Sequence, residues 1–174
     1  AVLVAADRLL GLDFGAQRLE KAAAEVGSDV PFFIRGGAQW ATGRGEVLAP
    51  ASAPAFACVI VAGAAGLSTA AVYRAFDDLP PPPPDDGAPP PSGAAGLARW
   101  CRNDLWPAAR SLDPGLARVH DLLTSAGAAP ALLCGSGSAI AGITATADEA
   151  GAIAERVAVA LPTARVMRAG FPGA

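Results

Sequence analysis

Hydrophobic positions along the chain follow two periods, and the change from one period to the other outlines the secondary structure. Apolar residues at helical spacing predict helices over 1–10, 17–26, 69–77, 94–102, 116–125 and 148–161. Apolar runs bounded by turn residues predict strands over 36–41, 46–48, 56–62, 131–134, 139–144 and 164–168. After residue 54, strands and helices follow a β-α-β-β-α-β order with additional helices between them. This order predicts an α+β fold, a ferredoxin-like sandwich.

Two segments interrupt these patterns. The loop over 49–54 is a candidate domain boundary, so we expect one domain at 1–53 and a second at 54–174. In Pro80–Ser92, two proline runs flank Asp85-Asp86-Gly87. Such a segment builds neither helix nor sheet, and we expect a solvated polyproline II loop at the surface. Binding of this loop to an SH3-like partner is the less favoured alternative.

Composition narrows the class of protein. Hydrophobic residues make up 52% of the chain, with many alanines and only 6% aromatic residues, which suits helices packed closely on a sheet. A net charge of -3 argues against a nucleic-acid partner. The three cysteines are scattered and odd in number, which suggests a reducing, cytoplasmic setting. No apolar run is long enough for a bilayer, so no membrane association is expected, and no basic region marks a signal peptide.

One segment, Gly27-Ser28-Asp29-Val30-Pro31, combines a helix end with an isolated carboxylate. Gly27 is expected to end the preceding helix in a left-handed conformation. Ser28 or Asp29 can cap a new helical turn, whose N-terminus keeps the Asp29 carboxylate ionised. Asp29 is then able to accept a proton from a substrate hydroxyl. The alternative, that Asp29 is only a helix cap, is favoured if physical chemistry alone is considered.

Three further motifs accompany this segment: Gly36-Gly37, Ala41-Thr42-Gly43-Arg44-Gly45-Glu46 and Leu133-Cys134-Gly135-Ser136-Gly137-Ser138-Ala139. Together with Gly27–Phe32 they resemble the GHMP kinases, the family of galactokinase and of the homoserine, mevalonate and phosphomevalonate kinases. The resemblance implies the end of a nucleotide-binding domain at 1–53, followed by the family's C-terminal domain. It also implies transfer of the γ-phosphoryl group of ATP, with Mg²⁺, to the 2-hydroxyl of 4-diphosphocytidyl-2-C-methyl-D-erythritol in isoprenoid biosynthesis. Asp29 is then the catalytic base.

The resemblance also suggests substrate-binding residues. A helix capped by Ser68 and Thr69 carries Tyr73, and in the family an aromatic ring at this point stacks on the cytosine of the substrate. The alternative is a tyrosine whose ring packs on the core, and the two interpretations are about equally supported. Gly135, Ser136 and Gly137 form the third-motif loop, which the resemblance places near the active site. Cys134 stands where the family usually has serine, and this change is expected to be tolerated.

Several motifs of the GHMP kinases are not found among these 174 residues. No capping residue precedes the helix that starts at Ala1, and neither the family's phosphate-binding loop nor its lysine motif is present. We therefore expect a fragment that is weak or inactive alone, and a monomer or weak homodimer. Its single histidine, His120, supports neither a zinc site nor a serine triad. Two alternatives stay open: another GHMP small-molecule kinase, or a non-catalytic binding module.

Overall fold

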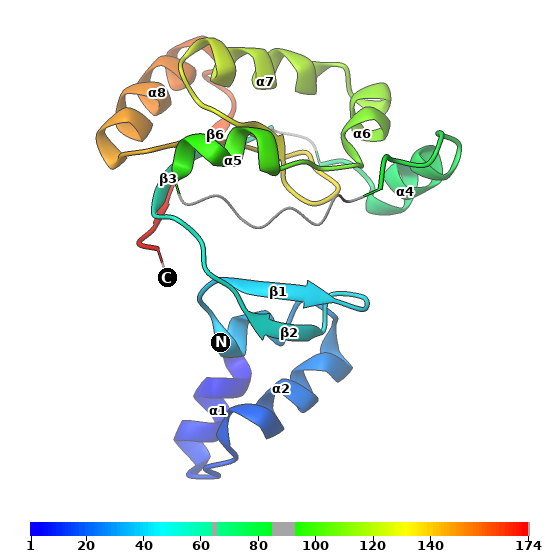
Figure 1. The fold of residues 1–174 in the computed structure, drawn as a ribbon, viewed down its shortest axis with the longest axis vertical. Coiled ribbons are helices and arrows are strands. Elements are labelled where there is room, and N and C mark those ends of the chain that lie inside the picture. Colours follow the sequence, from blue (N-terminus) through cyan, green and yellow to red (C-terminus); the bar gives the residue numbers. More distant parts are fainter. Residues whose placement is uncertain (64–65, 85–92, 174) are drawn as a thin grey trace. The chain divides into compact units, whose positions relative to one another are not determined.

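The computed structural model describes residues 1–63, 66–84 and 93–173 (Figure 1). The chain divides into two compact units, which we call the first unit (Ala1–Ala53) and the second unit (Pro54–Gly173). Most of the predicted proline-rich surface loop, residues 85–92, lies outside the described residues. Among the described residues, no helix is both long and apolar enough to cross a membrane.

The first unit consists of three helices and a two-stranded hairpin. Its elements are α1 (Val2–Leu10), α2 (Gly15–Val26), α3 (Phe32–Arg35), β1 (Gln39–Thr42) and β2 (Val47–Pro50). The two strands pair antiparallel, with Gln39 opposite Pro50 and Thr42 opposite Val47. The predicted hairpin is confirmed, although each strand begins later along the chain than expected.

The helix ends of the first unit differ from the prediction at Gly27. This residue follows α2 with φ 173° and ψ 154°, an extended conformation open to any residue, so the left-handed prediction is wrong. The left-handed glycine is instead Gly11 (φ 61°), which ends α1 and donates its N–H to carbonyls of the last helical turn. Gly27 extends because the chain leaves α2 directly into the turn that carries Asp29.

The second unit is built on a four-stranded antiparallel sheet in the order β4-β5-β3-β6. Its strands are β3 (Phe56–Ala62), β4 (Ala131–Leu133), β5 (Ile140–Thr144) and β6 (Arg165–Phe171). Its helices are α4 (Thr69–Asp77), α5 (Ala94–Trp100), α6 (Trp106–Leu112), α7 (Gly115–Ser125) and α8 (Ala147–Ala160). Taken along the chain as β3-α4-β4-β5-α8-β6, with α5, α6 and α7 added before β4, the predicted α+β order is confirmed.

Alternation along β3 divides the interior of the second unit into two layers. Ala57, Val59 and Val61 point to one face, where they join a core formed with side chains of α4, α6, α7 and α8. The opposite face is covered more thinly: Cys58 packs there with Leu97 of α5 and Ile143 of β5. Period-two alternation in a central strand therefore explains why helices are needed on both faces of the sheet.

Helix starts in the second unit follow local capping chemistry. The Ser68 hydroxyl accepts the N–H of Ala71, as predicted for the start of α4. At α8, Thr146 and Glu149 form a reciprocal capping box, a Thr-x-x-Glu signal that was overlooked in the sequence. Leu79 continues the apolar spacing of α4 in the sequence, but it is 38% exposed because the helix has already ended at Asp77.

Candidate active-site residues

Asp29 lies in the turn between α2 and α3, and its side chain is exposed. Helix α3 begins only at Phe32, with Pro31 at the N-cap position and no side chain bonded to the helix start. The alternative that Asp29 serves as a helix cap is therefore wrong, because the helix starts too far along the chain for its carboxylate to act there. Among the described residues, none donates a hydrogen bond to this carboxylate or pairs with it.

The Asp29 carboxylate lies beside the turn of the β1–β2 hairpin. A Cβ atom added at Gly45 would be 3.4 Å from Asp29 Oδ1 and 4.0 Å from the Ser28 carbonyl oxygen. Gly45 also has φ 109°, a conformation that other residues rarely adopt. The backbone conformation thus favours glycine here, and the distances show that the hairpin turn is in van der Waals contact with the Asp29 segment. The fold brings together the motif around Asp29 and the Thr42–Glu46 motif, which are separated along the chain.

Glu46 holds the hairpin turn in shape. Its carboxylate accepts the backbone N–H of Arg44 at 2.8 Å, and a Cβ at Gly43 would be 3.2 Å from its Oε1 atom. Hydrogen bonds from the backbone N–H groups of Glu46 and Arg44, aided by the Arg44 charge, lower the pKa of Glu46. The Arg44 side chain is 84% exposed with its Nε 3.8 Å from Glu46 Oε1, so it is largely solvated at the tip of the hairpin.

Arg35 connects three elements of the first unit and was not identified from the sequence. Its Nε and Nη2 atoms donate to the two carboxylate oxygens of Glu20 on α2, at 2.9 and 2.7 Å. Its Nη1 atom donates to the Leu48 carbonyl oxygen on β2 at 3.0 Å. The hydrogen bond to Glu20 raises the pKa of Arg35. These three hydrogen bonds join α3 to α2 and β2, and they thereby support the segment that carries Asp29.

Two of the predicted residues of the second unit, Thr69 and Ser136, meet at the third-motif loop, Gly135–Gly137. Thr69 Oγ1 and Ser136 Oγ are 2.9 Å apart, although 67 positions separate the two residues. A Cβ at Gly137 would lie 3.0 Å from Leu133 Cδ1 and 3.3 Å from Leu67 Cδ1, and its φ is 91°. The loop is therefore packed closely against the segment that leads into α4, and glycine is required at Gly137 for space as well as for conformation.

Asn103 has a role different from the one that its place in the sequence suggests. An asparagine at the end of one helical segment and ahead of another is a natural helix cap, but α6 begins at Trp106 and no side chain caps it. Instead, Asn103 Nδ2 donates to the carbonyl oxygens of Leu133 and Gly135, both at 2.8 Å. Asn103 Oδ1 accepts the N–H of Leu105 at 2.9 Å. The side chain lies against the third-motif loop because the chain turns once more before α6 starts.

Tyr73 lies one helical turn beyond Thr69 on α4 and is 52% exposed. Residues four apart share a face of a helix, so Tyr73 lies on the face that Thr69 presents to Ser136. The neighbouring Val72, at 0% exposed, is the residue of this turn that enters the core. The ring of Tyr73 is thus accessible to a ligand, and the core-packing alternative does not describe it.

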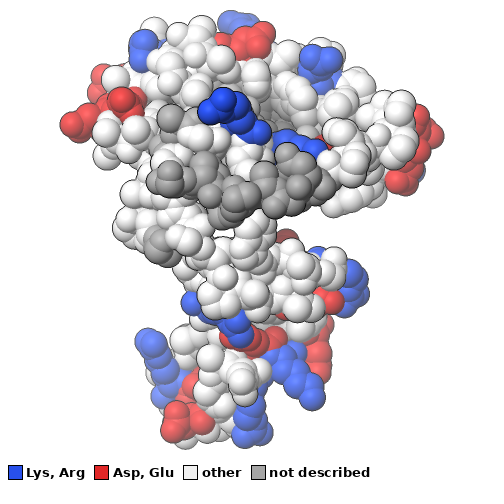
Figure 2. All heavy atoms as spheres, viewed as in Figure 1, with Lys and Arg blue, Asp and Glu red and all other residues white. Residues whose placement is uncertain are grey.

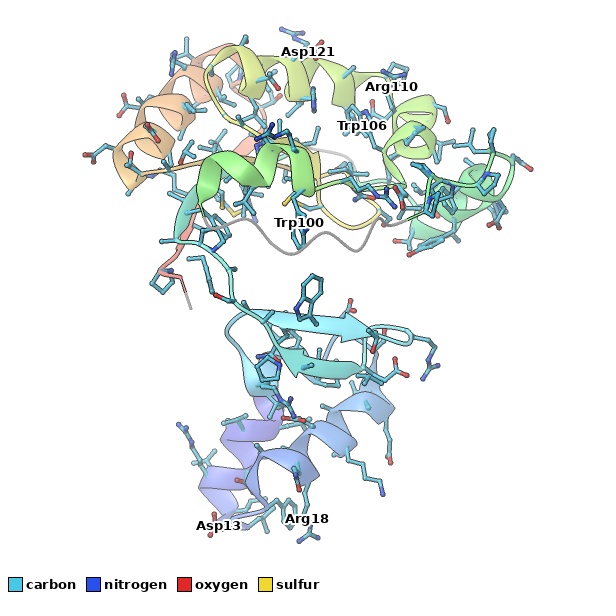
Figure 3. All side chains as sticks on the ribbon, in the orientation of Figure 1. Asp13, Arg18, Trp100, Trp106, Arg110 and Asp121 are labelled. Carbon is cyan, nitrogen blue, oxygen red and sulfur yellow. The ribbon has the colours of Figure 1, made fainter. Side chains whose placement is uncertain are left out.

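The remaining candidate residues are a cysteine and a histidine. Desolvation, together with a smaller effect of nearby Cys58, raises the pKa of the Cys134 thiol, which favours its neutral form. His120 stacks on Trp106 with ring centroids 5.1 Å apart, and its Nδ1 is 3.3 Å from Asp121 Oδ1. Figure 3 labels Trp106 on α6 and Asp121 on α7. Within the described ranges, no three His, Cys, Asp or Glu residues form a group that could hold a metal ion.

Charge is mixed across the surface of both units. On the face drawn in Figure 2, the Lys and Arg side chains are interspersed with Asp and Glu side chains. Among the described residues of this face, no continuous basic surface is visible.

Comparison with known proteins identifies relatives over most of the chain. Residues 93–162 match the family described as GHMP kinases C terminal. A Streptomyces avermitilis protein named 4-diphosphocytidyl-2-C-methyl-D-erythritol kinase is 40% identical over 184 aligned positions, covering 99% of this chain and 62% of that protein. A Nocardioides sp. protein of the same name is 41% identical over 163 positions, covering 88% of this chain and 55% of that protein.

A solved structure agrees with these sequence matches. The crystal structure of a 4-(cytidine 5'-diphospho)-2C-methyl-D-erythritol kinase matches with a TM-score of 0.73 and 29% identity, covering 97% of this chain and 61% of that one. The chain therefore spans a little more than half the length of the relatives that it matches. The similarity in sequence and fold to these kinases extends over both units, and residues 93–162 match the C-terminal domain of the GHMP kinases.

Proposed function

We propose that the chain is part of a cytoplasmic kinase that phosphorylates the 2-hydroxyl of 4-diphosphocytidyl-2-C-methyl-D-erythritol in isoprenoid biosynthesis. The observation that carries this proposal is the 40% identity, over 99% of the chain, to a kinase named for this substrate. In this proposal the first unit is the end of the nucleotide-binding domain, and the second unit is the C-terminal domain. The protein is a monomer or a weak homodimer in this proposal.

Asp29 is the base of the proposed reaction. Its carboxylate is exposed and does not act as a helix cap, so its oxygens are available to a substrate hydroxyl. The carboxylate orients the hydroxyl and accepts its proton as the oxygen attacks phosphorus. Gly45 and the Arg35 contacts hold the Asp29 segment in place. Since phosphoryl transfer depends mainly on positioning and charge, this support matters as much as the basicity of Asp29.

The second unit recognises the cytidyl group in this proposal. The exposed ring of Tyr73 offers a stacking surface for cytosine, and Thr69 lies on the same face of α4. Gly135, Ser136 and Gly137 bring the third-motif loop to the start of this helix through the Thr69–Ser136 contact. Stacking of a base on an aromatic side chain contributes about 1–3 kcal/mol in nucleic-acid binders, so one ring is a substantial contact.

ATP is the phosphoryl donor in this proposal, and Mg²⁺ accompanies it. The residues present do not provide a magnesium site, because the described part of the chain contains no suitable group of ligands. The chain also lacks a glycine-rich loop of the kind that surrounds ATP phosphates. We therefore derive no step through the metal, and we expect weak or no activity from residues 1–174 alone.

A chimaera provides the test. Residues 1–174 are joined to the part of the Streptomyces avermitilis relative that lies outside the match, and phosphorylation is measured with the cytidyl substrate, homoserine and mevalonate. We expect activity with the cytidyl substrate. Activity confined to a plain alcohol would favour another GHMP kinase, and a chimaera inactive with every substrate would favour a binding module.

The same chimaera tests Asp29. Asp29→Asn removes the negative charge and basicity, and we expect kcat to fall at least about 100-fold with little change in Tm. Asp13→Asn is the matched control: Asp13 is an exposed aspartate of the same unit with φ 49°, which asparagine also tolerates. A stable Asp29→Asn variant with a kcat near that of the control would remove Asp29 from the catalytic role.

A further inference from the structure

Asn103 uses all of its side-chain hydrogen-bonding groups next to the third-motif loop. It is the single asparagine of the sequence. Its Nδ2 atom donates to two backbone carbonyls on either side of Cys134, and its Oδ1 accepts one backbone N–H. The amide has two N–H donors and a carbonyl acceptor, so this arrangement satisfies each of them.

These bonds define the conformation of the loop. The carbonyl oxygens of Leu133 and Gly135 both lie 2.8 Å from one nitrogen atom, so their negative ends converge on Asn103. Without a donor at that position, the two carbonyls would be left unpaired close to each other, and the backbone between them would rearrange. The loop also requires Gly135 at φ 56° and Gly137 at φ 91°, which gives the backbone several alternative conformations to adopt.

The conformation of the loop determines a contact at the start of α4. Ser136, the residue after Gly135, meets Thr69 at 2.9 Å, and Tyr73 follows Thr69 by one turn of the helix. A change in the path of the loop at Gly135 moves the Ser136 hydroxyl away from Thr69. The side chain of Asn103 bonds to backbone groups only. Any effect on the side chains proposed to bind the substrate is therefore indirect.

We propose that Asn103 is a positioning residue for the cytidyl substrate, because it holds the third-motif loop where Ser136 meets Thr69. This inference rests on the proposed function. Removal of the amide leaves the catalytic Asp29 unchanged, since Asp29 belongs to the other unit. The expected defect is therefore in binding of one substrate, and not in the chemical step.

The kinetic test uses the active chimaera with Asn103→Asp and Asn103→Ala. Asp keeps the acceptor for Leu105 but replaces the donors with an oxygen that repels both carbonyls. We expect the KM for the cytidyl substrate to rise about tenfold, with the KM for ATP unchanged, because losing a hydrogen-bond partner typically costs about 1–2 kcal/mol, which corresponds to about tenfold. The Ala variant provides the same test if the Asp variant does not fold.

A control variant separates positioning from general destabilisation. Thr144, which is 6% exposed on β5, donates to the Thr146 carbonyl at 2.9 Å, away from the loop. Thr144→Val should lower Tm and leave both KM values unchanged. In a double-mutant cycle, Asn103→Ala should raise the cytidyl KM less in a Ser136→Ala background than in the unsubstituted chimaera. Additive effects, or parallel changes in both KM values, would overturn the inference.

A second measurement depends on no catalytic activity. When the chimaera is ligated from asparagine-¹⁵N-labelled residues 1–174 and an unlabelled second part, it shows a single pair of labelled side-chain amide signals, which belong to Asn103. Both hydrogens should be protected from exchange with solvent, and exchange at the rate of a free asparagine side chain would overturn the inference. A chimaera that transfers no phosphoryl group overturns the proposed function instead. Protected signals combined with a normal cytidyl KM in Asn103→Ala overturn the positioning role alone.

Discussion

The two units differ most in how they are held together. Among the described residues, the buried apolar side chains of the first unit are Leu19, Ala23 and Pro31, and α1 buries none. The second unit has a continuous core in which Val59, Leu123 and Ile140 are each 0% exposed. A unit with so little buried apolar surface gains little from the hydrophobic effect. The first unit therefore depends more on polar contacts and turn geometry than the second does.

This difference coincides with a division of the proposed chemistry. The proposed base, Asp29, lies in the first unit, where ion pairs and glycine turns shape the backbone around it. The proposed recognition residues, Thr69 and Tyr73, lie in the second unit, on a helix anchored in the core through Val72. The proposed recognition residues thus lie in the unit with the larger apolar core, while the proposed base lies near ion pairs and hydrogen bonds, which respond more readily to pH and salt.

The largest expected effect comes from removing core packing in one unit and comparing it with the other. Leu123→Ala in the second unit should lower the free energy of unfolding by about 2–5 kcal/mol, because it leaves a cavity in a packed core. Leu9→Ala in the first unit is the matched control: Leu9 is 85% exposed, and its loss should change stability by no more than about 0.5 kcal/mol.

Urea unfolding followed by circular dichroism measures both variants in the same protein. Equal losses in the free energy of unfolding for Leu9→Ala and Leu123→Ala would contradict the proposed difference between the two units. Such a result would mean that the apolar face of α1 is buried in solution as fully as the interior of the second unit.

A smaller effect is expected at Tyr73, and it sharpens the assignment of recognition to the second unit. In the chimaera, Tyr73→Ala should raise the KM for the cytidyl substrate about tenfold, because stacking on a base typically contributes about 1–3 kcal/mol. Tyr73→Phe keeps the ring and serves as the control, with little expected change. Steady-state kinetics distinguish the two, and identical KM values for the Ala and Phe variants would contradict a stacking role.

The smallest expected effect is on the pH dependence of the stability of the first unit. The folded state lowers the pKa of Glu46, so its contribution to stability is present above the unfolded pKa and is lost as pH falls through the lowered folded value. Glu46→Gln should reduce this acid-dependent loss, since the glutamine amide carries no ionisable group. Trp40 is the tryptophan of the first unit, so its fluorescence in a Trp100→Phe, Trp106→Phe background reports on this unit alone. If the Glu46→Gln variant loses stability in acid as readily as the protein with Glu46, other titratable groups govern the acid unfolding of the first unit.

Much of the fold was determined by the sequence alone, because period and capping are local properties. The bounds of β3, Phe56–Ala62, and of α4, Thr69–Asp77, agree with the prediction to the residue. The β-α-β-β-α-β order and the resemblance to GHMP kinases also followed from residues adjacent in the chain. The Thr146–Glu149 capping box was equally local and was available in the sequence, although it was not used.

The contacts that shape the candidate sites were decided only by the tertiary structure. Local chemistry allowed Asp29 and Asn103 to act as caps, but both helices start later than their positions require. The partners of Asn103 lie 30 and 32 positions away, and those of Thr69 lie 67 positions away. Such pairs form because strands and helices pack around a shared core, and a periodicity read along the chain contains no information about which distant side chains that packing brings within bonding distance.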